Sequence, residues 1–125
     1  MSDTFALIVV GGGPGGYVAA LRASQLGMYV ALAESTHMGG VCLNWRCIPT
    51  KALLRSSEIH HMLHELGNFG FSAENVSFDL SKIVGRSRSI ARRMGGGIAH
   101  LLKKARFTTF DGRATLAGRA CAAHK

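Results

Sequence analysis

Six residues, Gly11-Gly12-Gly13-Pro14-Gly15-Gly16, lie between two apolar segments and constrain the fold more than any other stretch. The segment before them, Phe5 to Val10, is continuously apolar, which is typical of a strand buried on both faces of a parallel sheet. After them, Tyr17 to Leu26 has the composition of a helix, and Gly27 is suited to end it. A second apolar strand follows from Met28 to Ala33. The order strand, helix, strand predicts a Rossmann-like βαβ unit in an α/β fold with a parallel sheet.

The glycines match the pattern G-x-G-x-x-G at Gly11, Gly13 and Gly16. In this pattern the first glycine permits a sharp turn, the second lets a pyrophosphate approach the backbone, and the third lets helix and strand pack closely. The N-terminus of the helix then faces the phosphates. Glu34 ends the second strand, where an acidic side chain accepts hydrogen bonds from the hydroxyls of an adenosine ribose. The sequence therefore favours a dinucleotide-binding site rather than a glycine-rich turn without a ligand. The pattern does not distinguish FAD from NAD as the ligand.

Two cysteines, Cys42 and Cys47, are separated by four residues. A zinc site would need two more ligands, and His60, His61 and His64 offer neither a second cysteine pair nor a matching spacing. Buried, inert cysteines are the ordinary alternative, but two at this spacing beside a nucleotide loop favour a disulfide that opens and closes. Cys47 lies where a helix is predicted to begin, and the helix dipole favours its thiolate. We expect a redox-active pair and no metal site.

Two further helices are predicted. The first runs from Cys47 to about Leu66, with Lys51 one turn after Cys47, where its charge could stabilise a reduced cofactor ring. The second begins after Asp79, a suitable N-cap, and carries an apolar stripe at a period near 3.6 as far as Leu102. Three glycines, 95–97, interrupt that stripe and predict a kink or close packing.

The C-terminal part contains two short predicted strands, Arg106 to Phe110 and Arg113 to Leu116, on either side of Gly112. Residues 119–125 have no apolar period and are expected to form a disordered tail. The length of 125 residues suits one domain, which we expect to span residues 1–118.

Charge and composition narrow the class of protein. The net charge is +8, and Arg and Lys are densest from Arg86 to Arg119, but aromatic residues are sparse there and no nucleic-acid reader motif occurs. We therefore expect a solvated face, or a surface for an acidic partner, and no nucleic acid. Three cysteines are too few for a disulfide scaffold, and neither a leader nor an 18-residue apolar stretch is present, so we expect a cytosolic protein without a membrane segment.

The motifs together resemble a known family. The order of glycine loop, Glu34 and Gly39-Gly40-Val41-Cys42-Leu43-Asn44-x-x-Cys47-Ile48-Pro49-Thr50-Lys51 is similar to that of the flavin-dependent disulfide oxidoreductases. The Leu-Asn and Ile-Pro pairs around the cysteines are most similar to the dihydrolipoyl dehydrogenase branch. The resemblance runs from about Thr4 to Gly118, and the cysteine motif is highly specific.

The resemblance implies an FAD site. FAD would lie extended along the fold, with its ribose at Glu34 and its pyrophosphate on the glycine loop. Cys47 would face the flavin, while Cys42 would exchange with a dithiol substrate. The implied cofactor-binding residues are Gly11, Gly13, Pro14, Gly16, Glu34, Gly40, Val41, Cys42 and Lys51, with Gly112 and Ala114 contributing backbone atoms.

The implied activity is oxidation of dihydrolipoyl groups. Electrons would pass from the dithiol to Cys42–Cys47, then to FAD and then to NAD, and the partner would be a lipoyl-bearing protein or a small dithiol. Two alternatives stay open: a sister enzyme acting on glutathione-like disulfides or mercuric ion, and a non-catalytic FAD-binding fragment.

The chain departs from the family in two ways. Arg46 stands where family members have glycine, and its side chain is expected to crowd the flavin or strain the turn between the cysteines. Family members are also several hundred residues long, and add an NAD domain, the rest of the FAD domain and a dimer-interface domain with a histidine-glutamate pair. We therefore expect this chain to be an incomplete FAD domain that is inactive alone.

Overall fold

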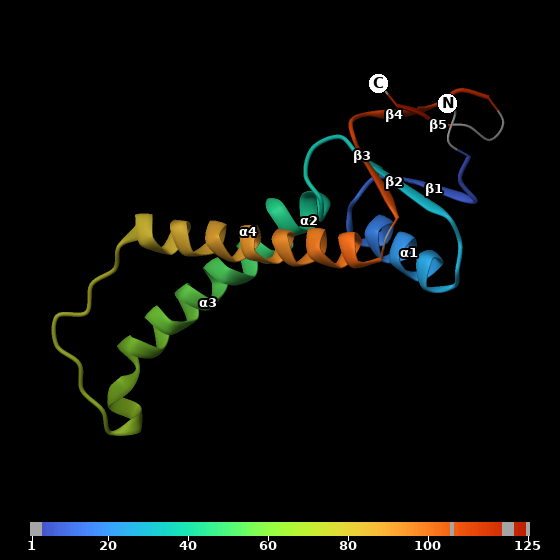
Figure 1. Ribbon diagram of the computed structural model, residues 1–125. Coiled ribbons are helices and arrows are strands. Elements are labelled where there is room, and N and C mark those ends of the chain that lie inside the picture. Colours follow the sequence, from blue (N-terminus) through green and yellow to red (C-terminus); the bar gives the residue numbers. More distant parts are fainter. Residues whose placement is uncertain (1–3, 106, 119–121, 125) are drawn as a thin grey trace.

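The computed structural model describes residues 4–105, 107–118 and 122–124, the last three by their backbone alone. Helices and strands alternate at the start of the chain, two long helices follow, and short strands end it (Figure 1). In chain order the elements are β1 (Leu7–Val10), α1 (Pro14–Gln25), β2 (Val30–Glu34), α2 (Gly40–Asn44), α3 (Cys47–His64), the 3₁₀ turn η1 (Leu66–Phe69), α4 (Leu80–Lys104), β3 (Thr108–Asp111), β4 (Ala114–Leu116) and β5 (Ala122–His124).

A parallel sheet has the order β1-β2-β3. Leu7 pairs with Val30 between the first two strands, and Ala31 pairs with Thr108 between the second and third. The predicted α/β fold with a parallel sheet is therefore confirmed, and β3 joins it from far along the chain. β4 and β5 form a separate antiparallel pair.

The central strand β2 is the one buried on both faces. Val30, Ala31, Leu32 and Ala33 are all buried, whereas β1 is half-buried and its last residue, Val10, is 56% exposed. The prediction that the first strand is buried on both faces is therefore wrong. The physical reason is that β2 has a neighbour on each side, while β1 has only β2 beside it in the described part of the chain.

Helix α1 begins at Pro14, three residues before the predicted start. Proline suits the first position of a helix because its missing N–H would have no partner there, and Gly13 precedes it as the N-cap. The predicted end is confirmed: Gly27 has a φ of +83°, its N–H donates to Ser24 O at 3.0 Å, and Met28 N donates to Ala23 O at 3.1 Å. These two bonds form a Schellman motif, which satisfies carbonyls at the end of the helix.

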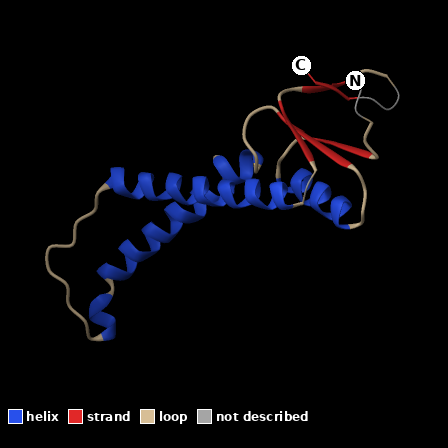
Figure 2. Ribbon diagram, viewed as in Figure 1, coloured by secondary structure: helices blue, strands red, loops and turns tan. Residues whose placement is uncertain are grey.

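Helices α3 and α4 form a long hairpin that projects from the α/β part of the molecule (Figures 1 and 2). The predicted cap of α4 is confirmed, because Lys82 N donates to Asp79 Oδ1 at 3.0 Å. The helix continues through the three glycines, 95–97. A Cβ at Gly95 would lie 3.7 Å from Leu43 Cδ2, an ordinary contact, so the close packing predicted there is limited to this position.

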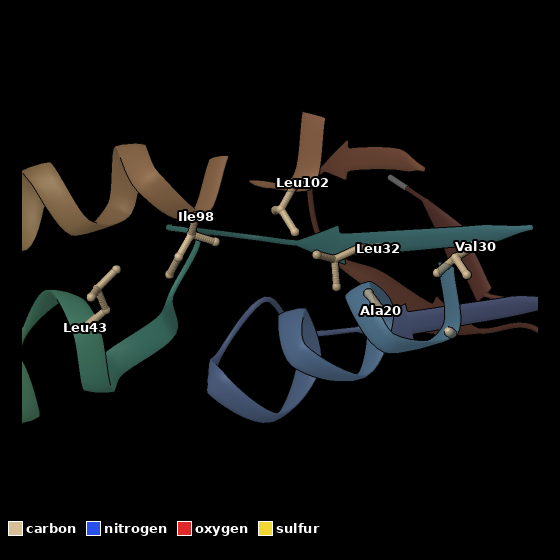
Figure 3. Packing of buried hydrophobic residues seen from close by; sticks show 7 residues of the cluster. Ala20, Val30, Leu32, Leu43, Ile98 and Leu102 are labelled. Carbon is tan, nitrogen blue, oxygen red and sulfur yellow. The ribbon is translucent and has the colours of Figure 1, made fainter. Parts of the chain in front are cut away.

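The hydrophobic core lies between the sheet, α1, α2 and the C-terminal half of α4 (Figure 3). Its buried residues are Ala20, Ala23, Val30, Leu32, Leu43, Ile98 and Leu102. The outer part of the hairpin lies beyond this core, and its apolar side chains are exposed, including Leu54 at 62%, Phe69 at 70% and Phe78 at 67%. The apolar face predicted for the helix after Cys47 is therefore largely uncovered in this chain.

The four arginines of α4 divide into two groups. Arg86 donates to Ala52 O at 3.1 Å and Arg88 donates to Asn44 O at 3.2 Å, so these two arginines join α4 to α3 and α2. Arg92 and Arg93 are exposed, as the expectation of a solvated face requires.

The C-terminal residues differ from the expected disordered tail. Ala122–His124 forms β5, which pairs antiparallel with β4 through Ala114 and His124, so the expectation is wrong for these three residues. The other residues of the expected tail, 119–121 and 125, lie outside the described residues.

Candidate active site

The carboxyl ends of the three parallel strands bring distant residues together. Gly11 follows β1, Glu34 ends β2 and Gly112 follows β3. Gly11 N donates to Ala33 O at 2.7 Å, and Gly112 N donates to Glu34 O at 2.9 Å. In open α/β sheets ligands bind outside this edge, so the predicted nucleotide residues have the position that such a site requires.

The glycines of the loop differ in whether the fold of the chain requires glycine at their position. Gly11 has a φ of +100°, which favours glycine. A Cβ at Gly16 would overlap the carbonyl oxygen of Gly11, so this position allows helix and strand to approach. A Cβ at Gly13 would meet no atom within 4 Å, and its φ of −68° is open to any residue. Within the described chain, therefore, no contact requires glycine at position 13. A ligand that approached the backbone there would require it.

Glu34 is fixed by the loop on one side and by the next turn on the other. Its Oε2 accepts from Gly12 N at 2.7 Å, while its Oε1 accepts from Thr36 N at 2.9 Å and Thr36 Oγ1 at 3.1 Å. Partial burial raises the pKa of Glu34, but the hydrogen bonds from Gly12, Thr36 and Ser35 outweigh it and leave the pKa below the ordinary value of a glutamic acid. The side chain is therefore a carboxylate at neutral pH, with oxygen lone pairs to offer to a hydroxyl.

A hollow of about 280 Å³ opens beside Glu34, at the ends of β2 and β3. Sequence reasoning singled out only Glu34 among its lining residues. A serine-threonine pair directly after a strand is typical of a turn, and this signal could have indicated Thr36. The parallel pairing of β3 with β2 brings in the others, and no local pattern predicts that pairing. The hollow is lined by Glu34, Thr36, His37, Met38, Thr109, Phe110 and Asp111.

A pair of glycines joins the loop to the cysteines. Gly39 N donates to Gly12 O at 2.8 Å. Gly40 has a φ of +58°, and a Cβ there would lie 2.9 Å from Gly13 Cα. Helix α2 therefore begins directly against the glycine loop, and it brings Cys42 to the same side of the sheet.

Cys42 in α2 forms a disulfide with Cys47, the first residue of α3, and their Cα atoms lie 4.7 Å apart. The intervening turn is held by its backbone, since Trp45 N and Arg46 N both donate to Val41 O, at 3.0 and 2.9 Å. The Asn44 side chain adds bonds to Gly40 O at 2.9 Å and Met38 O at 3.2 Å. The two predicted redox cysteines are thus joined within a braced turn.

The two sulfur-bearing residues differ in accessibility. Cys42 is half-buried and Cys47 is exposed. Cys47 lies at the N-terminus of an 18-residue helix, as predicted, and the partial positive charge there favours a thiolate when the disulfide is reduced. Lys51 is exposed and lies one turn further on, so it shares a face of α3 with Cys47.

Arg46 is exposed and precedes α3 as its N-cap residue. Its φ is −118°, outside the left-handed region that favours glycine. The φ at this position therefore does not require glycine, and the expected strain of the turn stays a prediction. The expected crowding of a flavin stays a prediction.

The histidines of α3 lie away from the cysteines. His60 lies thirteen positions after Cys47 on one continuous helix, which corresponds to about 20 Å. Within the described part of the chain, no three His, Cys, Asp or Glu side chains gather as a metal-ligand set. The same part of the chain contains no helix that is both long enough and apolar enough to cross a membrane.

Comparison with known proteins decides the family. The family described as pyridine nucleotide-disulphide oxidoreductase matches residues 5–123. The chain belongs to this family. Among curated relatives, the dihydrolipoyl dehydrogenase of Zymomonas mobilis is 51% identical over 118 residues, which are 94% of this chain and 25% of that protein. The dihydrolipoyl dehydrogenase of Rhizobium etli is 48% identical over 93% of this chain and 24% of its own length. The chain thus spans about a quarter of these family members.

Two solved structures share the fold of this chain. LpdA from Mycobacterium tuberculosis superposes with a TM-score of 0.80 at 26% identity, covering 90% of this chain and 24% of that one. The flavoprotein disulfide reductase RclA from Escherichia coli, solved as a Cu(II) complex, superposes with a TM-score of 0.74 at 23% identity, covering 92% of this chain and 23% of that one. The second likeness supports the fold alone.

Proposed function

We propose that this chain forms the FAD-binding, disulfide-bearing part of a dihydrolipoyl dehydrogenase-type oxidoreductase. The observation that carries the proposal is the contact between the disulfide segment and the glycine loop. Gly39 N donates to Gly12 O at 2.8 Å, and Cys42 follows only three residues later. A disulfide attached directly to a dinucleotide loop suits the transfer of electrons between a dithiol and a bound cofactor. The high identity to dihydrolipoyl dehydrogenases supports this branch over the glutathione and mercuric ion enzymes.

The residues at the strand ends fit FAD. Gly13 leaves its backbone open to a pyrophosphate, with Gly11, Pro14 and Gly16 shaping the loop and the start of α1. The ionised Glu34 would accept hydrogen bonds from the ribose beside the adjacent hollow. When bound, FAD would accept two electrons from the cysteine pair and deliver them to NAD.

Other parts of the cofactor would meet residues further along the chain. Gly40 and Val41 lie between the loop and the disulfide, and Val41 is 56% exposed. Lys51 would stabilise negative charge on the reduced ring, since it shares a face of α3 with Cys47. Gly112 and Ala114 would contribute backbone atoms from the turn after β3.

The dithiol step uses the two cysteines. One substrate thiolate attacks Cys42 Sγ, the Cys42–Cys47 bond breaks, and Cys47 leaves as a thiolate. The second substrate thiol then attacks the substrate sulfur of this mixed disulfide, which releases the oxidised cyclic substrate and the Cys42 thiol. Two electrons and two protons leave the substrate, and the cysteine pair holds both electrons. The helix dipole of α3 lowers the cost of the Cys47 thiolate.

The assignment of the two cysteines requires that the cofactor cover Cys47, because Cys47 is the more exposed of the two in this chain. Reduced protein should therefore show a change of reactivity on binding FAD. We expect alkylation of Cys47 to slow at least several-fold in the presence of FAD, while alkylation of Cys42 changes little. Mass spectrometry of the two alkylated cysteines would measure this, with a Cys121→Ser background to remove the third thiol.

Electron transfer gives the decisive test. After reconstitution with FAD under anaerobic conditions, dihydrolipoamide should bleach the visible flavin band of the chain. Cys42→Ser and Cys47→Ser should each abolish the bleaching while retaining FAD. A chain that binds FAD but is not bleached by any dithiol would support the non-catalytic alternative, and a preference for reduced glutathione over dihydrolipoamide would support the sister enzymes. The proposal also includes four properties that rest on the likeness to the family. These are NAD as the final electron acceptor, a lipoyl-bearing protein as partner, homodimer formation and a cytosolic location.

A further inference from the structure

Although the sequence led us to expect no metal site, we propose a binding site for a divalent transition-metal ion on the exposed end of α3, formed by His60 and His64. The two residues are one helical turn apart, and their Nε2 atoms lie 3.3 Å apart. Their ring centroids are 4.6 Å apart, with planes inclined by 69°. The site is distinct from the cysteines, from which α3 separates it by about 20 Å.

The separation of the nitrogens suits chelation. Metal–nitrogen bonds to imidazole are about 2.0–2.1 Å long, so nitrogens 3.3 Å apart subtend about 107° at a shared metal ion, close to the tetrahedral angle. Histidines at i and i+4 on one helix face are a known zinc-binding arrangement. Without metal, the same distance serves a hydrogen bond from a protonated Nε2 to a bare one. With metal, both Nε2 atoms present lone pairs and each neutral ring carries its proton on Nδ1.

The surroundings of the pair hold it open and oriented. Phe78 packs edge-on against His60 at 5.8 Å between ring centroids, with an interplanar angle of 86°. This contact limits the rotation of the His60 imidazole. It therefore reduces the side-chain entropy that would be lost when a metal ion binds. Both histidines are exposed, so water can supply the remaining ligands.

The charge around the pair is mixed, in a chain that carries +8 overall. No Lys or Arg occurs in residues 56–81, which contain four of the seven acidic residues: Glu58, Glu65, Glu74 and Asp79. Glu58 lies against Arg55, Glu65 against His61, and Asp79 against Lys82. Lys82 and Arg86 also line the hollow beside His60, so the proposal rests on the geometry of the two imidazoles and not on the local charge. Imidazole ligands select Zn²⁺, Cu²⁺ or Ni²⁺ over Mg²⁺ or Ca²⁺.

Calorimetric titration with Zn²⁺ tests the site, using the full chain with the Cys42–Cys47 disulfide oxidised and Cys121→Ser in every sample. We expect one Zn²⁺ per chain and at least tenfold weaker binding in both His60→Ala and His64→Ala. Two matched controls, His61→Ala and His100→Ala, remove exposed histidines outside the pair and should bind within twofold of the parent. Mg²⁺ should give no heat of binding at the same concentration.

A stability measurement adds a second readout. Because the metal would clamp one turn of α3, saturating Zn²⁺ should raise the thermal unfolding midpoint of the parent and leave that of His64→Ala unchanged. The absence of saturable binding in the parent would overturn the proposal. It would equally fail if His64→Ala bound like the parent, or if His61→Ala lost as much affinity, since the ligands would then be His61 and Glu65.

Discussion

Replacing Gly16 by alanine should destabilise the fold, whereas the same replacement at Gly13 should mainly weaken FAD binding. The added Cβ at Gly16 would overlap the carbonyl oxygen of Gly11, a backbone atom with little freedom because Gly11 N is bonded to Ala33 O at 2.7 Å. Overpacking costs about 1–3 kcal/mol, and a rigid backbone neighbour argues for the upper end, about 3 kcal/mol. Alanine returns up to about 1 kcal/mol of helix propensity, which leaves a net loss of about 2 kcal/mol.

The matched change at Gly13 has a different cost. Its Cβ would meet no atom within 4 Å, and the φ of −68° and ψ of −178° are open to alanine. The destabilisation comes only from the weaker N-cap preference of alanine relative to glycine. This effect is worth less than about 1 kcal/mol. The new methyl group would, however, occupy the space in which we propose that the pyrophosphate approaches the backbone.

Urea unfolding followed by circular dichroism measures the first effect, and quenching of flavin fluorescence measures the second. With a slope of about 1.5 kcal/mol per molar urea, Gly16→Ala should lower the unfolding midpoint by about 1.3 M, while Gly13→Ala lowers it by less than half as much. FAD affinity should fall at least tenfold in Gly13→Ala. Equal midpoints for the two variants would refute the packing argument, and unchanged FAD affinity in Gly13→Ala would refute the ligand argument.

Three further predictions concern single side chains. The lowered pKa of Glu34 contributes stability that is present above the pKa of the unfolded chain and is lost as the pH falls through the folded pKa. Glu34→Gln should therefore be less stable than the parent by about 1 kcal/mol at pH 7, and this difference should disappear in acid. Urea unfolding measured at several pH values would test both expectations. Arg46→Gly should raise FAD occupancy and slow the alkylation of reduced Cys47 at neutral pH, because it removes both bulk and a positive charge; equal FAD affinity in the two proteins would remove the steric half of this reasoning. Asp79→Ala should cost about 1 kcal/mol through loss of the cap on Lys82 N, whereas Ser77→Ala, outside the helix, should cost much less; similar urea midpoints for the two variants would contradict the capping role.

Local signals in the sequence determined the elements and much of the chemistry. Gly27 terminates α1 and Asp79 caps the start of α4. Both positions can be predicted from sequence because capping depends only on residues within one turn of the helix end. The thiol pair was found in the same way, since Cys42 and Cys47 are separated by a single turn. Such features need no knowledge of distant residues, so a single sequence is sufficient to find them.

Tertiary structure decided the features that join distant residues. The parallel pairing of β3 with β2 makes β2 the buried strand and leaves β1 at an edge, and it depends on segments separated by the whole helical hairpin. The bond between Glu34 Oε2 and Gly12 N is not encoded at either position alone, because it requires the register of β1 on β2. His60 and His64 share a helix face by sequence, but the 3.3 Å approach of their nitrogens depends on side-chain torsions. Periodicity fixes which face a residue occupies, whereas contacts between faces arise only when the chain packs.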